Sequence, residues 1–85
     1  MNPIPVRVMV EDAWDQVTLD LQPAASIAEA KHLALALTRT RGMPEEYVVK
    51  FRGAEVLDEG RSLAESGVVA NAALIVLPRR RRPVR

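Results

Sequence analysis

Two runs of alternating apolar and polar residues near the start of the chain constrain its fold most strongly. In residues 6–10 every second residue is valine, and residues 17–21 repeat the pattern with valine and leucine. A period of two residues places alternate side chains on the same face of a strand. The segment between the runs, residues 11–15, is short and polar, so the two runs predict a β-hairpin.

A helix is predicted after the hairpin. Pro23 stops the second strand, and Ser26 with Glu29 three residues later has the spacing of a capping box. Residues 26–41 are rich in alanine and leucine, which favour helix, and Gly42 is placed to end it. A spacing of 3.6 residues predicts an apolar stripe, with Leu35 outside it. The stripe consists of Ile27, Ala30, Leu33, Ala34 and Leu37.

The second half of the chain predicts further strands. Residues 47–51 alternate again, residues 55–57 suit a short fourth strand, and residues 62–66 suit a single helical turn. Residues 73–77 form a final apolar strand that Pro78 ends. This order predicts an α+β domain with one main helix packed across a mixed sheet of four to five strands. The expected core includes Val8, Leu19, Ile27, Val49, Leu63, Leu74 and Val76.

Three short motifs carry a resemblance to a known family. They are Gly42-Met43-Pro44, Phe51-Arg52-Gly53 and Leu57-Asp58-Glu59-Gly60-Arg61-Ser62-Leu63. Their order and spacing resemble ubiquitin, which implies a ubiquitin-like β-grasp fold over residues 1–78. The long predicted helix is also similar to that of small bacterial ubiquitin-like proteins associated with type VII secretion (the YukD/EsaB type). Proteins of this family act by presenting a surface and a tail, so the resemblance implies a protein without catalytic residues.

Composition narrows the function classes. The chain has 85 residues, no cysteine and one histidine, His32, so disulfides and thiolate metal sites are excluded and a histidine-based catalytic site has little to build on. We expect no metal, cofactor, enzymatic activity or small-molecule substrate. The first residues lack the basic and apolar runs of a signal peptide, and no apolar stretch approaches the ~18 residues of a membrane span. A cytoplasmic protein is expected.

The end of the sequence is strongly basic, whereas residues 1–78 carry seven basic and eleven acidic side chains. We expect residues 79–85 to be a disordered, solvated tail. Binding of the tail to an acidic protein is the second interpretation, and binding to nucleic acid or an anionic membrane is the third. The tail arginines are Arg79, Arg80, Arg81, Arg82 and Arg85.

Covalent modifiers and sulfur carriers of the ubiquitin-like family end in Gly-Gly. Here the four glycines, Gly42, Gly53, Gly60 and Gly67, all lie inside the predicted domain. A carrier function is therefore disfavoured, and an atypical modifier or sulfur carrier stays as the alternative hypothesis.

The face of the sheet away from the helix is the predicted binding surface. The resemblance aligns Lys50 with the central isoleucine of ubiquitin's apolar patch and Leu77 with its strand-five valine, so half of that patch is kept. Trp14, in the polar turn, is either a binding hot spot or a ring folded onto its own hairpin, because tryptophan is enriched among hot spots. We therefore expect a protein-interaction module that acts through its sheet face, hairpin tip and tail. The expected protein-binding residues are Met9, Trp14, Val48, Lys50, Ile75 and Leu77.

Overall fold

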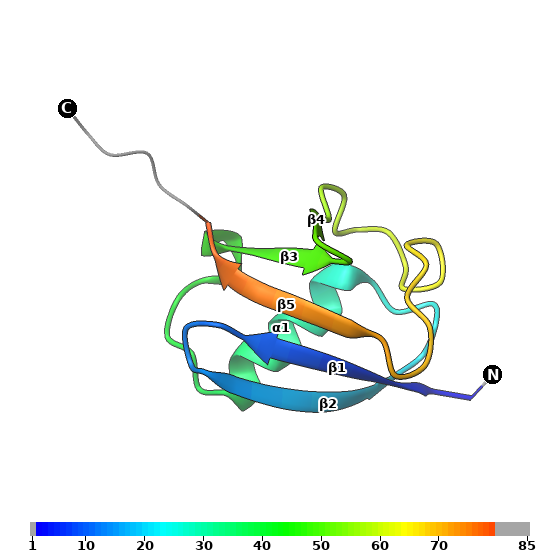
Figure 1. Cartoon of the computed structure of the whole chain (residues 1–85), viewed down its shortest axis with the longest axis horizontal. Helices are drawn as coiled ribbons and strands as arrows, with labels where there is room; N and C mark the ends of the chain where they lie inside the picture. Colours follow the sequence, from blue (N-terminus) through cyan, green and yellow to red (C-terminus); the bar gives the residue numbers. More distant parts are fainter. Residues whose placement is uncertain (1, 80–85) are drawn as a thin grey trace.

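The computed structural model describes residues 2–79, which form one sheet covered on one face by a single α-helix (Figure 1). The sheet order is β2-β1-β5-β3-β4, with β1 and β5 parallel at its centre and the other pairs antiparallel. The predicted α+β class and mixed sheet are therefore confirmed. The elements are β1 (Ile4–Val10), β2 (Asp15–Leu21), α1 (Ile27–Leu37), a 3₁₀ turn η1 (Pro44–Glu46), β3 (Tyr47–Phe51), β4 (Ala54–Glu55) and β5 (Ala73–Pro78).

The core lies between α1 and the sheet. Alternate residues of the three central strands point toward the helix, as the period of two predicted. Each predicted core residue is buried; Val68, in the loop before β5, was not predicted and is buried with them. The predicted members are Val8, Leu19, Ile27, Val49, Leu63, Leu74 and Val76.

The helix begins where the sequence predicts and ends earlier. The Ser26 hydroxyl accepts a hydrogen bond from the Glu29 N–H at 3.0 Å. At the other end Arg39 adopts a left-handed φ of 55°, its N–H bonds Ala36 O at 3.1 Å, and the Thr40 N–H bonds Leu35 O at 3.0 Å. These two bonds satisfy the last carbonyls in a Schellman motif. The prediction of a helix reaching Arg41 was therefore wrong.

Gly42 has a different role from the predicted helix stop. A Cβ at this position would lie 2.5 Å from Cε1 of Tyr47. The missing side chain lets the Tyr47 ring pack against this part of the backbone.

The helix is also rotated relative to the predicted stripe. Leu35 is buried at 4% exposure, whereas Leu33 and Leu37 face solvent, with Leu37 60% exposed. Lys31, which the predicted stripe did not include, is buried on the core side of the helix, because a partly buried partner stabilises its charge. That partner is Glu59, whose Oε1 lies 2.6 Å from Lys31 Nζ, and Nζ also donates to Tyr47 O at 3.0 Å.

Of the two short elements in this half of the chain, β4 differs from its predicted form and the helical turn matches it. β4 covers Ala54–Glu55 rather than residues 55–57, and Leu57 is 85% exposed in the following loop. Residues 62–66 form the predicted single helical turn, closed by the hydrogen bond from Ser66 N–H to Ser62 O at 3.0 Å, and the turns continue to residue 67. Ser62 and Glu65 fix these turns through reciprocal 3.0 Å bonds between side chain and backbone.

Candidate functional site

The sheet face away from α1 displays one side chain from each strand in a row. Met9 on β1 lies beside Ile75 on β5, and Ile75 lies beside Lys50 on β3. Gln16 on β2 and Glu55 on β4 extend the row at its two ends. The structure thus brings together Met9, Ile75 and Lys50, as the alternation of the strands predicts.

Leu77 and Val48 form a second pair on the same face, one step further along β5. Val48 is 7% exposed, whereas Ile75 is 42% exposed and Leu77 is half-buried. Val48 therefore offers little contact area to a partner, and the accessible apolar surface consists of Met9, Ile75 and Leu77.

A depression of about 480 Å³ lies beside Leu77. Its walls carry Glu11 and Glu55 as well as Lys50 and Arg79, so its charges are mixed. Arg79 is held there by two bonds, from its N–H to Glu46 O at 2.7 Å and from its Nε to Glu45 O at 3.3 Å. The other predicted tail residues, Arg80, Arg81, Arg82 and Arg85, lie outside the described residues.

Trp14 lies in the turn between β1 and β2, near the same end of the sheet. The Glu11 N–H bonds Val76 O at 2.9 Å, which ties the start of this turn to β5. The indole is 83% exposed, and Trp14 adopts a left-handed φ of 50°. The interpretation in which the ring folds onto its own hairpin is therefore wrong, because this backbone geometry directs the side chain into solvent.

The buried Tyr47 holds the turn that contains Trp14. Tyr47 OH donates to Asp12 Oδ2 at 2.8 Å. Burial, followed by the hydrogen bond to Asp12 and the negative charges of Asp12 and Glu46, together raise the pKa of Tyr47 to about 12.

The other titratable residues named from the sequence are His32, Asp58 and Glu59. His32 is exposed on α1. Asp58 accepts the Gly60 N–H at 3.1 Å, and Glu59 pairs with Lys31, so the acidic pair stabilises its loop. Residues 2–79 contain no cluster of histidine and carboxylate side chains that could hold a metal ion. Within this range no helix is long and apolar enough to cross a membrane.

Two groups of residues were not predicted from the sequence. The Lys31–Glu59 pair was missed because Lys31 lies outside the predicted apolar stripe and the sequence gives no sign of its distant partner. The position of Arg52 was also missed, although its turn could have been recognised from the glycine that follows it.

Comparison with solved structures identifies the class of fold. A ubiquitin-like domain from Arabidopsis thaliana has 18% identity and a TM-score of 0.77, with 100% of this chain and 86% of that chain covered. The ubiquitin of Caldiarchaeum subterraneum has 12% identity and a TM-score of 0.77, with 95% and 99% covered. A protein designed de novo on the basis of ubiquitin has 18% identity and a TM-score of 0.79, with 99% and 98% covered.

No protein-family model matches the sequence, and neither does any curated protein. The structural similarity alone shows that the chain has the ubiquitin-like β-grasp fold, which confirms that resemblance. The more specific resemblance to the bacterial secretion-associated proteins is not confirmed. Its basis was a long helix, and α1 has 11 residues.

Proposed function

We propose that this protein is a non-enzymatic interaction module that binds another protein through the sheet face and the β1–β2 turn. The exposure of Trp14 carries the proposal. Its large aromatic surface is solvated, and its turn is held by hydrogen bonds from Ala13 N–H to Val10 O and from Trp14 N–H to Glu11 O. An exposed indole on a hydrogen-bonded turn offers apolar area to a partner at a low entropic cost.

The row of side chains on the sheet supports the same surface. Met9, Ile75 and Leu77 add apolar area next to the turn, and Lys50 provides a charged group at its edge. Apolar centres with polar rims are typical of protein interfaces, and aromatic residues and methionine are enriched there. The surface is therefore suited to a partner with an apolar contact region.

The groups with shifted pKa values support a role without catalysis. Tyr47 donates to Asp12 beneath the turn. Hydrogen bonds from the Ser62 backbone and side chain lower the pKa of Glu65. Both groups are held in structural hydrogen bonds, so neither offers a free acid or base. The carrier and tail-driven alternatives depend on residues beyond Arg79, and no described contact favours them.

The test is affinity capture followed by titration. The wild-type chain, Trp14→Ala, Leu77→Asp and a variant lacking residues 80–85 are immobilised and exposed to lysate of the source organism at low and high salt. A protein captured by wild type is purified and titrated against each chain. We expect Trp14→Ala to weaken its binding by about 2 kcal/mol or more, as for an aromatic hot spot. Removal of residues 80–85 should mainly reduce the association rate at low salt.

Leu57→Ala is the matched control for Trp14→Ala. Leu57 is as exposed as Trp14 but lies in the loop after β4, away from the β1–β2 turn (Figure 1). Leu77→Asp also requires a check that the chain remains folded, because Leu77 is in β5. The proposal fails if Trp14→Ala and Leu77→Asp bind like wild type while the shortened chain does not bind.

A further inference from the structure

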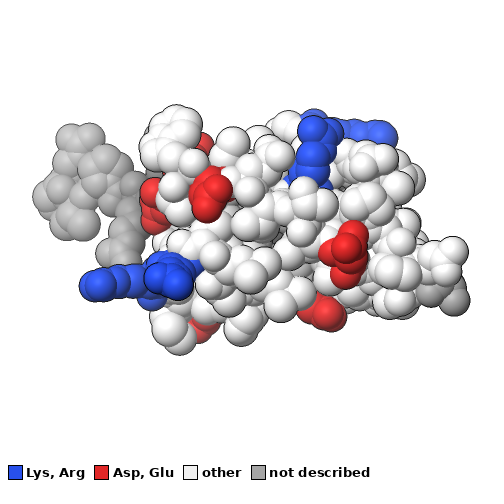
Figure 2. All heavy atoms as spheres, turned by 90° about the horizontal axis from the view of Figure 1, so that it is seen from below, with Lys and Arg blue, Asp and Glu red and all other residues white. Residues whose placement is uncertain are grey.

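A second depression lies on the sheet face, toward the opposite end from Trp14. It measures about 490 Å³ and lies where the turn after β3 meets the loop before β5. Its charged lining consists of Arg7 and Arg52, with no acidic side chain, and Val69 and Ile75 provide apolar walls. Figure 2, a view from below, shows basic side chains in separate groups, with acidic side chains between and beside them.

Arg7 is held in position by the loop before β5. Its Nε and Nη2 donate to Asn71 O at 3.3 and 3.0 Å. Asn71 has a left-handed φ of 69°, and its own N–H bonds Pro5 O at 2.6 Å, so the loop is fixed to β1. The guanidinium has five N–H donors, and those not used for Asn71 can bind a ligand. Arg7 is thus a preorganised cation.

Arg52 is held by the turn that joins β3 to β4. Phe51 pairs with Ala54, which leaves Arg52 and Gly53 as a two-residue turn with left-handed φ values of 54° and 81°. Asparagine, aspartate or glycine usually occupies the first position of such a turn, because other side chains are strained there. The guanidinium lies 5.1 Å from the centre of the Phe51 ring, which further restricts it.

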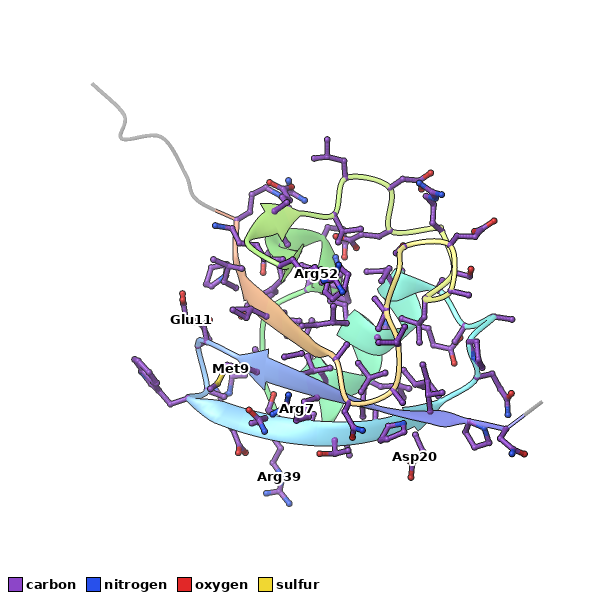
Figure 3. The ribbon with its side chains drawn as sticks, turned by 45° about the vertical axis from the view of Figure 1, so that its right-hand side comes forward. Arg7, Met9, Glu11, Asp20, Arg39 and Arg52 are labelled. Carbon is purple, nitrogen blue, oxygen red and sulfur yellow. The ribbon has the colours of Figure 1, made fainter. Side chains whose placement is uncertain are left out.

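Arg7 and Arg52 lie on either side of the same part of β5. Arg7 is in register with Ala73 on β5, and β3 follows on the other side of β5. Two strand spacings put their backbones about 10 Å apart. Figure 3 labels Arg7 on β1 and Arg52 beyond β5, so that the strand with the small Ala73 side chain runs between them.

Neither arginine has a carboxylate partner within residues 2–79, where the one ion pair is Lys31–Glu59. Asp20 on β2 is in register with Pro5 rather than Arg7, and its side chain points away from Arg7 in Figure 3. Two fixed and unpaired cations beside an apolar wall are complementary to a pair of carboxylates next to an apolar side chain.

We propose that the Arg7–Arg52 site binds an acidic segment of a partner protein, with two carboxylates on the arginines and an apolar side chain on Val69 and Ile75. This inference rests on the proposed function, because it names the chemistry of a partner at the same sheet face. Nucleic acid fits less well, since two cations neutralise only two phosphates and residues 2–79 carry eight basic and eleven acidic side chains.

A displayed library of random twelve-residue peptides tests the site. The library is selected against the whole chain, against Arg7→Gln/Arg52→Gln and against Arg39→Gln/Arg61→Gln, a control that removes the same charge elsewhere. We expect peptides selected on wild type to be enriched in pairs of Asp or Glu next to an apolar residue. Their affinity should fall roughly tenfold on Arg7→Gln/Arg52→Gln, the loss expected for charge-assisted hydrogen bonds. The control should retain it.

Arg7→Lys/Arg52→Lys should recover part of the binding, because the charge remains while the bidentate geometry is lost. Folding of each variant is checked by circular dichroism, and Gln at position 7 keeps a donor for Asn71 O. The inference is overturned if selected peptides are not enriched in acidic residues, or if the enrichment persists on Arg7→Gln/Arg52→Gln. Selected peptides that lack acidic residues and whose binding depends on Trp14 would overturn this inference alone. If no peptide is selected, the result counts against the proposed function as well.

Nucleic acid is tested separately with a fluorescent single-stranded oligonucleotide. Weak binding that is equal in wild type and Arg7→Gln/Arg52→Gln supports the protein assignment. Binding tighter than that of the best peptide, and lost in this double variant, would assign the site to nucleic acid instead.

Discussion

Lys31 is a charged side chain in an otherwise apolar core. Its ammonium group lies between Glu59 Oε1 and the backbone oxygen of Tyr47, so it connects α1 to β3 and to the loop after β4. A lysine at such a position is stable only while its partners are present, because an unpaired charge in the interior loses its hydration without compensation.

Replacing Glu59 by Gln should therefore destabilise the fold. We expect a loss of about 2–3 kcal/mol, less than the ~3–5 kcal/mol of a fully buried pair, because the Glu59 side chain is partly exposed and water reaches it. Urea denaturation followed by circular dichroism measures the change, with exposed Asp20→Asn as the control. The double variant Lys31→Met/Glu59→Leu should recover most of the loss. A double variant less stable than Glu59→Gln would contradict this account.

Tyr47 predicts a pH dependence of stability at high pH. Its pKa in the folded protein is about 12, raised from about 10 first by burial and then by Asp12 and Glu46. The folded state favours the protonated phenol, so this stabilisation is complete below pH 10 and is lost as pH rises toward 12. Since Tyr47 is the single tyrosine, its ultraviolet titration reads this pKa directly.

Asp12→Asn provides the control for this titration. The substitution removes a negative charge but keeps an oxygen acceptor, so the pKa of Tyr47 should fall while staying above 10, because burial is the largest cause of the shift. A titration midpoint near 10 in the wild-type chain would show that Tyr47 is more solvated than the structure indicates.

At the scale of the element, the end of α1 contains a correctable strain. Arg39 occupies the left-handed position of the Schellman motif, where a Cβ costs about 1–2 kcal/mol. Arg39→Gly should stabilise the protein by about 0.5–1 kcal/mol, because the relief exceeds the added entropy of glycine in the unfolded chain. Arg41→Gly, outside the motif, is the control and should not stabilise. Thermal and urea unfolding measure both variants, and a destabilised Arg39→Gly would refute the assignment.

The predictability of the elements follows from how local their causes are. The strands could be predicted because alternation depends only on neighbouring residues, and the helix start because Ser26 caps it locally. The end of the helix could not be predicted, since Arg39 occupies a position usually given to glycine. Its rotation could not be predicted either, since the burial of Lys31 depends on a partner 28 positions away. At the site, alternation predicted which residues share the face, but the orientation of Trp14 depends on a backbone angle that composition does not reveal.

At the scale of the whole molecule, adjacent residues of β5 face different environments. Leu74 is 1% exposed toward the helix, whereas Ile75 is on the opposite face. Leu74→Ala should cost about 2–5 kcal/mol, much of the stability of a domain this small, because it leaves a cavity in the one core. Ile75→Ala should cost less than about 1 kcal/mol. Equal costs, measured by urea denaturation, would mean that the two faces of the sheet are assigned incorrectly.

The parallel pairing of β1 and β5 has a mechanical consequence. Because these central strands run in the same direction, the start of β1 and the end of β5 lie at opposite ends of the sheet (Figure 1). A force that pulls residues 2 and 79 apart therefore acts along the strands and shears the hydrogen bonds between β1 and β5 together. Pulling on residues 4 and 21, which lie side by side on β1 and β2, would instead open the hydrogen bonds between β1 and β2 one after another. We expect the domain to resist extension through its two ends much more strongly than it resists peeling of its hairpin.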